Sequence, residues 1–254
     1  MTASKLGATV GVSESTVVRF ATEIGYSGYP AMQQGVQGMI RNKLTTFQRL
    51  EMTSRNIPMD KLLDAVLEQD IDILRRTREN MDTAAFYRAV DDLVKARRVF
   101  VLGAGSSLAL ATFLAHYMQL IFDSVQLVEA TSEAAILQQM VRVHEDDAII
   151  AISFPRYSKK AAKALKYASN RGMSAVAITD SPNSPVAESA SHILLARSDM
   201  VSFVDSLVGP LSLINALIVT VAIRKKAEVS RSLQLMESIW DEYGVYEKVD
   251  EEEQ

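Results

Sequence analysis

Arg98-Val-Phe-Val-Leu-Gly-Ala-Gly-Ser-Ser107 is the segment that most clearly predicts the fold of this chain. An apolar run is followed at once by two glycines and two serines, which is the pattern of a short buried strand that turns into a helix. Gly103 and Gly105 permit a tight turn that brings the backbone close to a ligand. The amides at the start of the following helix, together with Ser106 and Ser107, could then hold a phosphate group. Taken alone, the loop is equally typical of an ordinary strand-to-helix turn.

The rest of the chain from residue 82 onward alternates helical and strand patterns. This alternation predicts an α/β fold with a doubly wound, five-stranded parallel sheet. The expected strands are apolar runs, interrupted only by Gln126 in residues 125–128, as buried parallel strands require. The expected strands are residues 99–102, 125–128, 148–152, 175–178 and 193–195. The expected helices are residues 82–96, 107–122, 132–141, 158–170 and 204–227.

The loops that follow these strands are the candidate ligand site, because ligands bind beyond the carboxyl ends of parallel strands. Three of the four loops that follow the first four strands are rich in hydroxyl groups. The loop at residues 153–160 also carries Arg156, which can bind a phosphate or a carboxylate through two hydrogen bonds. Lys159 and Lys160 in the same loop are more typical of a solvated helix start.

A dinucleotide-binding fold is the nearest alternative interpretation of the glycine loop. Gly103 and Gly105 match its first two glycines, and Glu129 falls at the end of the second strand, where a ribose-binding acid would lie. Leu108 occupies the third glycine position, where it would obstruct close packing of helix and strand. Two serines in the turn also suit a terminal phosphate better than a bridging pyrophosphate.

The first 56 residues contain a helix pair that is typical of a DNA-reading helix-turn-helix. Gly11 lies at the turn, Gly7 lies where the two helices would cross closely, and Ser13 is suited to cap the second helix. The apolar residues of the second helix recur at helical spacing, so they are expected to face inward. These residues are Val17, Phe20, Ala21 and Ile24.

The opposite face of the second helix presents short hydroxyls and one arginine. Ser15 and Thr16 can contact phosphates or base edges, and Arg19 can bind a guanine edge or a phosphate. The same face is also compatible with an amphipathic helix whose polar side faces water. Residues 1–56 hold six basic and three acidic residues, which gives this part a charge of +3. Because the net charge of the whole chain is −4, the remainder carries −7. A basic first part favours DNA binding.

The composition narrows the remaining possibilities. The chain has no cysteine, which excludes disulfides and cysteine metal sites, and its three scattered histidines lead us to expect no metal site. The amino terminus lacks the pattern of a signal peptide, so a cytoplasmic location is expected. Residues 207–223 carry no charge, but Pro210 and three polar residues favour a buried or subunit-facing helix over a membrane span.

Both parts of the chain together resemble the bacterial RpiR/MurR family of transcriptional regulators, and the resemblance covers nearly the whole chain. It implies a winged-helix-like DNA-binding domain over residues 1–56 and a sugar isomerase (SIS) domain that senses a phosphosugar over residues 57–254. It also implies a homodimer or a homotetramer. Family members normally carry helices before the reading pair, and this module is expected to lack them. The motifs that carry the resemblance are Gly11-Val-Ser-Glu-Ser-Thr-Val-Val-Arg-Phe20, Gly25-Tyr-Ser-Gly-Tyr29, Gly103-Ala-Gly-Ser-Ser107, Ser153-Phe-Pro-Arg-Tyr-Ser158 and Thr179-Asp-Ser-Pro-Asn-Ser-Pro185.

The resemblance implies roles for individual residues as well. Ser153 and Ser158 look like the ends of a second phosphate-binding motif whose centre differs here, and Glu133 after Ser132 resembles a pair that contacts the sugar. Together, the residues and the resemblance assign operator DNA to Ser13, Ser15, Thr16 and Arg19. They assign the phosphosugar to Gly103, Gly105, Ser106, Ser107, Ser153, Arg156, Ser158 and Glu133.

These observations predict a regulator with operator DNA and a phosphosugar effector as partners, and with no cofactor and no catalytic residue. The alternative is a phosphosugar isomerase of the same fold, which needs a general base next to the carbonyl carbon. Glu129, Glu133 and His116 are the candidates for that base, although His116 in mid-helix is more typical of a packed structural histidine. A third possibility is a sensor that does not bind DNA, given the short amino terminus.

Overall fold

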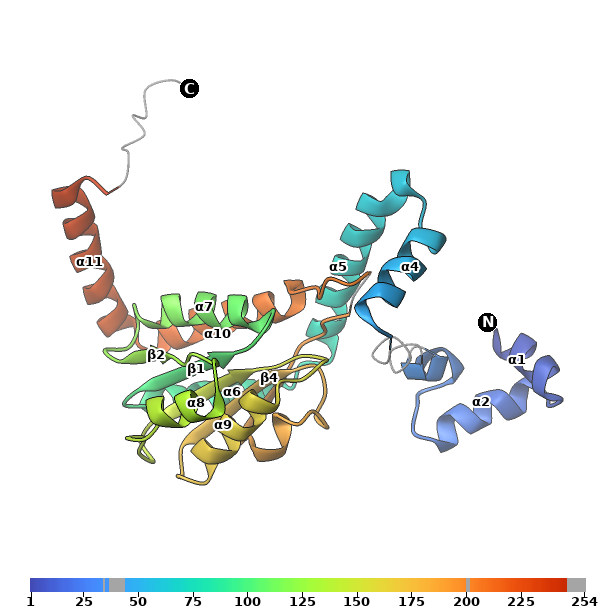
Figure 1. Cartoon of the computed structure of the whole chain (residues 1–254), viewed down its shortest axis with the longest axis horizontal. Helices are drawn as coiled ribbons and strands as arrows, with labels where there is room; N and C mark the ends of the chain where they lie inside the picture. The colour runs from blue at the N-terminus through green and yellow to red at the C-terminus, as the bar shows by residue number, and fades with distance from the viewer. Residues whose placement is uncertain (34, 37–43, 200–201, 246–254) are drawn as a thin grey trace, which may run out of the picture. The chain divides into compact units, whose positions relative to one another are not determined.

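The computed structural model describes residues 1–33, 35–36, 44–199 and 202–245. The chain divides into two compact units. One comprises Met1–Ala65 with Asp199–Val204, and the other comprises Val66–Ser198 with Asp205–Gln254. Figure 1 shows the course of the chain through both units.

The first unit begins with the expected helix pair, α1 (Ala3–Val10) and α2 (Glu14–Glu23). Gly11 ends α1 in the left-handed conformation, with a φ of 75°. A Cβ atom on Gly7 would lie 2.7 Å from the carbonyl oxygen of Val12, so the two helices approach as closely as only glycine permits. Ser13 caps α2 and accepts a hydrogen bond from the amide of Thr16 at 3.2 Å. The turn, the close crossing and the cap are therefore confirmed.

The buried face of α2 is narrower than its apolar pattern predicts. Val17 and Ala21 are buried against a cluster that includes Tyr29. Phe20 and Ile24 remain 53% and 49% exposed, so their predicted inward orientation was wrong. The physical reason is that α1 and the helical residues 29–33 cover one edge of α2 and leave the adjoining apolar edge open.

Two further helices follow in the chain. α4 (Thr46–Asn56) begins with a capping box, in which Thr45 accepts from the amide of Gln48 and the Gln48 side chain accepts from the amide of Thr45. After the short 3-10 helix η1 (Met59–Lys61), α5 (Leu62–Glu79) begins in the first unit and continues into the second. Ile73 and Thr77 are the buried residues of α5.

The second unit contains the expected five-stranded, all-parallel sheet, in the order β2-β1-β3-β4-β5. In the register of the sheet Gly103 pairs with Ile152, and Ile152 pairs with Ile178. The loops after β1, β3 and β4 therefore leave the sheet at the same level. The strands are β1 (Val99–Gly103), β2 (Val125–Leu127), β3 (Ala148–Ile152), β4 (Ser174–Thr179) and β5 (His192–Leu195).

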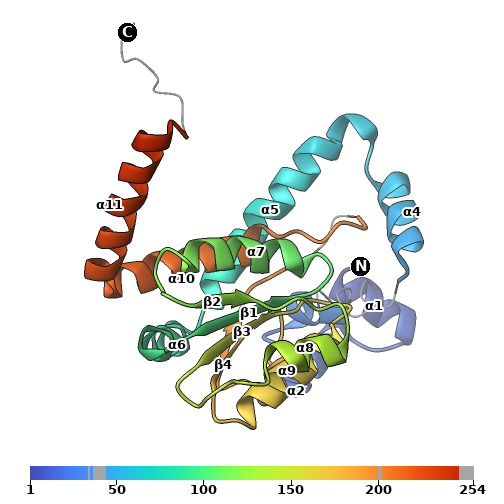
Figure 2. The same ribbon diagram turned by 60° about the vertical axis from the view of Figure 1, so that its left-hand side comes forward.

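Helices cover both faces of this sheet, as Figure 2 shows. One face packs against α6 (Thr83–Lys95), α7 (Ser107–Met118) and α10 (Val208–Arg224). The other packs against α8 (Glu133–Gln139) and α9 (Lys159–Ser169), and the 3-10 helix η2 (Ala187–Ser189) follows β4. Alternate residues of β1 enter the two cores, with Val101 in the first and Leu102 in the second.

The prediction of a single helix over residues 204–227 was wrong. The chain breaks at Lys225, where α10 ends and α11 (Lys226–Tyr243) begins with a bend of 100°. α10 packs its inner face on the sheet, whereas α11 contains no buried residue. Within the described residues no single helix is long and apolar enough to cross a membrane, and α10 and α11 pass that test only together, across their bend.

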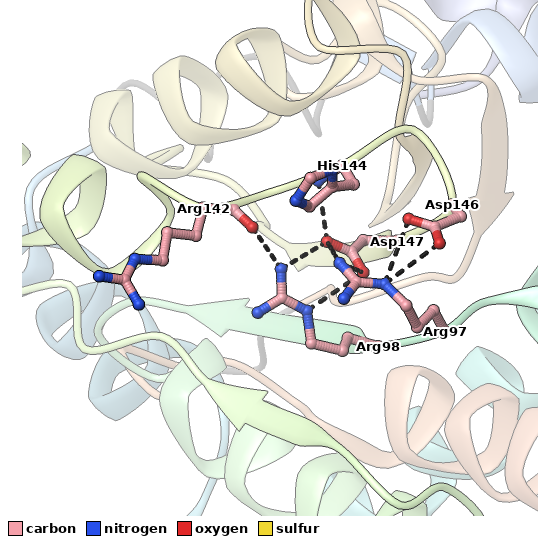
Figure 3. A network of polar contacts seen from close by, with 6 residues as sticks. All are labelled: Arg97, Arg98, Arg142, His144, Asp146 and Asp147. Carbon is pink, nitrogen blue, oxygen red and sulfur yellow. Dashed lines mark hydrogen bonds and ion pairs between the residues drawn. The ribbon is translucent and has the colours of Figure 1, made fainter.

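A buried carboxylate joins the amino ends of β1 and β3 (Figure 3). The side chain of Asp147 is fully buried and accepts hydrogen bonds from Arg98 at 2.7 Å, from Arg97 at 3.2 Å and from the amide of His144 at 2.9 Å. Arg98 also donates to the carbonyl oxygen of Arg142. Burial alone would raise the pKa of Asp147, but the hydrogen bonds from Arg98 and the His144 amide, with the two arginine charges, hold that pKa below its usual value.

Candidate functional site

The glycine loop after β1 needs its two glycines for different reasons. A Cβ atom on Gly103 would overlap the carbonyl oxygen of Ser107 and would lie 2.9 Å from the Cβ atom of Ala111, because α7 packs directly onto the end of the strand. Gly105 has a φ of 62° and nothing within 4 Å of the position of a Cβ atom, so its role is conformational. The loop is therefore held close to the start of α7 by packing at one glycine and by the turn at the other.

The two serines of this loop have different surroundings. Ser106 is exposed, and its hydroxyl donates to Oδ2 of Asp205 at 2.7 Å. Ser107 is only 3% exposed. The accessible hydroxyl of the loop is thus that of Ser106, and the sequence offered no signal that Asp205, 99 residues later, would engage it.

The start of α7 retains the features of an anion-binding helix terminus. α7 has 12 residues, carries no acidic residue in its first turn, and receives no capping hydrogen bond from the side chain of Ser106. The positive end of its dipole is thus not offset by a carboxylate of the helix itself.

The serines of the loop after β3 organise the loop itself. Ser153 is 2% exposed, and its Oγ accepts a hydrogen bond from the amide of Ser158 at 3.1 Å. Ser158 caps α9 by accepting from the amide of Ala161 at 3.3 Å. Between them, Arg156 adopts a left-handed φ of 67°, which is strained for a residue with a side chain, and this side chain is exposed.

A tyrosine links the loops after β3 and β4. The hydroxyl of Tyr157 donates to Oδ1 of Asp180 at 2.8 Å. Burial and the neighbouring carboxylate of Asp180 raise the pKa of Tyr157 above its usual value, so the hydroxyl stays protonated and remains a donor at neutral pH. This link fixes the two loops with respect to one another.

The loop after β2 is held by a lysine of α9. The ammonium group of Lys160 donates to the carbonyl oxygens of Ala130 at 2.9 Å and Thr131 at 2.7 Å. The expectation that Lys160 is a solvated helix-start cation was therefore wrong. Two carbonyl oxygens of a neighbouring loop offset its charge at the helix terminus, which composition and spacing could not reveal.

Glu133, the expected sugar contact, lies in the first turn of α8 and pairs with Lys163 on α9 through both carboxylate oxygens, at 2.7 and 2.8 Å. Glu133 and Lys163 line a groove of about 270 Å³ between α8 and α9. No residue of the loop after β1 lines this groove. The glycine loop therefore takes no part in forming this groove.

The three candidates for an isomerase base show no common arrangement. His116 is exposed on α7 beside the ring of Tyr117, so the expectation of a packed structural histidine was wrong. At Glu129 the amide and carbonyl group are both bound by the side chain of Gln139. Within the described residues no hydrogen bond or ion pair joins Glu129, Glu133 and His116, and none of these residues forms a group that could hold a metal ion.

The polar face of α2 collects hydroxyl groups at its amino terminus. Ser13 Oγ lies 2.8 Å from both Ser15 Oγ and Thr16 Oγ1, and all three side chains are exposed. Arg19 is also exposed, and its guanidinium lies 3.7 Å from the carboxylate of Glu23. Hydroxyls, a helix terminus and one arginine on a single open surface are what phosphate and base-edge contacts need.

Comparison with known proteins identifies a SIS domain in this chain and finds its relatives among transcriptional regulators. Residues 92–220 match the family model of the SIS domain. An HTH-type transcriptional regulator of Clostridium perfringens is 25% identical over 189 residues, which is 74% of this chain and 67% of the relative. The matched region thus spans about two thirds of that relative's length.

Solved structures extend the comparison. The sugar isomerase domain of the RpiR transcription factor from Sphaerobacter thermophilus is 30% identical, with a TM-score of 0.66 over 70% of this chain and 99% of that chain. The NanR protein of Vibrio vulnificus in complex with ManNAc-6P is 21% identical and shares the fold, with a TM-score of 0.63 over 96% of this chain and 86% of that chain. Sugar-phosphate isomerases are also among the solved structures with this fold. The chain therefore belongs to the SIS domain family and is related over most of its length to HTH-type transcriptional regulators of the RpiR and HexR kind.

Proposed function

We propose that this chain is a bacterial transcriptional regulator that binds operator DNA through α1 and α2 and a phosphosugar through the loops after β1 and β3. The observation that carries the proposal of phosphosugar binding is the loop at residues 103–107, which leads into a helix whose first turn has no carboxylate. The relation to HTH-type regulators supports the DNA half. Such a regulator acts in the bacterial cytoplasm, where the operator is.

The proposed effector site places the phosphate against the amides at the start of α7 and the hydroxyl of Ser106. Ser158 and the exposed guanidinium of Arg156 supply further donors from the loop after β3. Ser107 and Ser153 are buried, so their role is to shape the two loops from inside. Glu133 would contact a sugar hydroxyl while still paired with Lys163.

We propose binding without catalysis as the role of this site. An isomerase needs a base that is free to take a proton from carbon. Among the candidate bases, Glu133 is held through both carboxylate oxygens by Lys163. Incubation with aldose and ketose phosphates is therefore expected to leave them unchanged, and any interconversion would favour the isomerase.

A homodimer or homotetramer is part of the proposal, since a two-fold pair of reading helices matches the symmetry of an operator. The exposed apolar residues of α11, among them Leu235, Ile239 and Tyr243, support an assembly because they would be costly to leave in water. Sedimentation of the intact chain would measure its mass, and a monomer at micromolar concentration would contradict this part.

The effector half predicts a selective thermal response. At least one of three sugar phosphates is expected to raise the melting temperature, because a ligand that binds only the folded state stabilises it. The three are N-acetylmannosamine 6-phosphate, glucose 6-phosphate and fructose 6-phosphate. The corresponding free sugars are expected to have no effect at the same concentration. Equal responses to phosphorylated and free sugars would show that the loop at residues 103–107 does not recognise phosphate.

The DNA half predicts an arginine-specific loss of affinity. On a sequence selected from a random DNA library, Arg19→Ala is expected to weaken binding by about 1–3 kcal/mol, or roughly fivefold to 150-fold, because one base or phosphate contact is lost. Fluorescence anisotropy at fixed salt measures the change. Arg55→Ala on α4 is the matched control, since Arg55 is equally exposed and pairs with Glu51 in the same i,i+4 manner. Equal losses in both variants, or selection of no preferred sequence, would contradict DNA reading by α2.

A further inference from the structure

The hydroxyl of the phosphate loop already has a negatively charged partner. Ser106 donates to the carboxylate of Asp205 at 2.7 Å, and Asp205 is half-buried on the segment that leads into α10. A hydroxyl has one proton to donate. Ser106 therefore cannot donate to Asp205 and to a bound phosphate at the same time.

Charge makes the conflict stronger. A phosphate that binds the start of α7 would stand within a few ångströms of the carboxylate that Ser106 now holds, and two like charges at that separation repel by about 1 kcal/mol or more. An anion at this loop therefore binds well only when Asp205 moves away.

Ser206, the next residue after Asp205, is hydrogen-bonded to α5. The hydroxyl of Ser206 donates to Oδ1 of Asp70 on α5 at 2.6 Å, and the carbonyl of Ser206 accepts from the hydroxyl of Ser198 at 3.1 Å. A short segment thus joins the phosphate loop on one side, through Asp205, and α5 on the other, through Ser206.

The segment at residues 205–209 packs tightly against α5. Gly209, in the first turn of α10, is so close to α5 that a Cβ atom there would lie 2.8 Å from Thr77 Oγ1 and 2.9 Å from Ile73 Cγ2. A shift of the segment at residues 205–209 therefore changes its contacts with α5. Along the chain, α5 begins at Leu62 in the helical unit that contains α1 and α2.

We propose that Asp205 competes with the effector's phosphate for Ser106, and that its displacement carries effector occupancy through Ser206 to α5. This proposal rests on the proposed function. It adds that Asp205 is the group that the phosphate displaces from Ser106, and that the displacement is transmitted toward α5. Asp205 is a regulatory residue of the effector site rather than a ligand of the effector. The coupling is the differential affinity of the effector for the two positions of Asp205.

The test compares Asp205→Asn with the wild-type chain. Titration calorimetry with N-acetylmannosamine 6-phosphate and with inorganic phosphate is expected to give an affinity about tenfold higher for Asp205→Asn, because the charge repulsion is removed. Asp123→Asn is the matched control: it removes the same charge from an exposed residue between α7 and β2 and is expected to bind as the wild type does.

The outcomes separate this proposal from the proposed function. Tighter binding by Asp205→Asn alone, including binding that the wild type lacks, supports the competition. Affinities of wild type and Asp205→Asn within twofold of one another overturn it, and weaker binding by Asp205→Asn overturns it by making Asp205 a ligand contact. If neither protein binds inorganic phosphate, N-acetylmannosamine 6-phosphate, glucose 6-phosphate or fructose 6-phosphate, the phosphosugar function itself is overturned.

The second step has its own readout. In the wild type, N-acetylmannosamine 6-phosphate is expected to speed hydrogen exchange of the amides in residues 66–79, because the hydrogen bond from Ser206 to Asp70 is released. In Ser206→Ala the same amides are expected to exchange faster from the outset and to respond less. Effector binding that leaves the exchange of α5 unchanged in the wild type would overturn the relay while leaving the competition at Ser106 intact.

Discussion

Replacement of Asp147 by asparagine is expected to lower the free energy of unfolding by about 2 kcal/mol, because it removes the charge of a fully buried carboxylate that holds two partly exposed arginines. The carboxylate is fully buried between β1 and β3 and holds Arg97, Arg98 and the amide of His144. Asparagine keeps the volume of the side chain but loses its charge and one acceptor. Urea unfolding of the intact chain, followed by circular dichroism, measures the loss.

Asp146→Asn is the control for this prediction. Asp146 also pairs with Arg97, at 3.1 Å, but its side chain is 56% exposed. An exposed ion pair contributes about 0–1 kcal/mol, so this variant is expected to unfold almost as the wild type does. Similar losses in both variants would mean that burial is not what makes Asp147 important.

The same carboxylate predicts a dependence of stability on pH. The pKa of Asp147 is lower in the folded chain than the value of about 3.9 in an unfolded one, so folding favours its charged form. Its contribution is therefore fully present above about pH 5 and is lost as the pH falls through the folded-state pKa. The difference in stability between the wild type and Asp147→Asn is expected to shrink as the pH falls over that range. A difference that grows toward acidic pH would show that folding does not lower the pKa of Asp147.

Replacement of Gly103 by alanine is expected to cost more than about 3 kcal/mol of stability and to abolish phosphosugar binding. The added Cβ atom would overlap the backbone of Ser107 and press on Ala111, and backbone atoms cannot rotate out of the way as a flexible side chain can. α7 must move away from the end of β1, and the amides at its start move with it. Thermal unfolding and titration with the best phosphosugar measure the two effects.

Gly105→Ala separates packing from backbone conformation in the same loop. No atom lies within 4 Å of the position of its Cβ, so the cost is that of a left-handed residue, about 1–2 kcal/mol. A Gly103→Ala protein that is no less stable than Gly105→Ala would show that the close contact of β1 and α7 is not needed.

The local features of the chain were predictable because they depend on neighbours in the sequence. Gly11 in the left-handed conformation, the cap at Ser13 and the turn at Gly105 each follow from what one residue does to its own turn. The three central strands were predictable for a related reason, because the apolar runs of β1, β3 and β4 fit a sheet that is covered on both faces.

The errors share a different cause. Phe20 and Ile24 continue an apolar pattern correctly, yet which edge of α2 is covered depends on the helices that reach it. Lys160 has a charge that spacing places in water, but two carbonyl oxygens of the loop after β2 hold it. The bend at Lys225 interrupts a helical pattern that the residues themselves would allow to continue.

For the candidate site, the residue pattern was enough to identify the loops that carry glycine, hydroxyl and arginine at the carboxyl ends of the strands. Which of these groups face outward depends on the packing of the folded chain, which buries Ser107 and Ser153 and leaves Ser106 accessible. It also decided the partners Asp205 and Lys163, which lie 99 and 30 residues from the groups they bind. The physical reason is that hydrogen bonds and ion pairs depend on separation in space, and a parallel sheet brings the ends of distant strands to one edge.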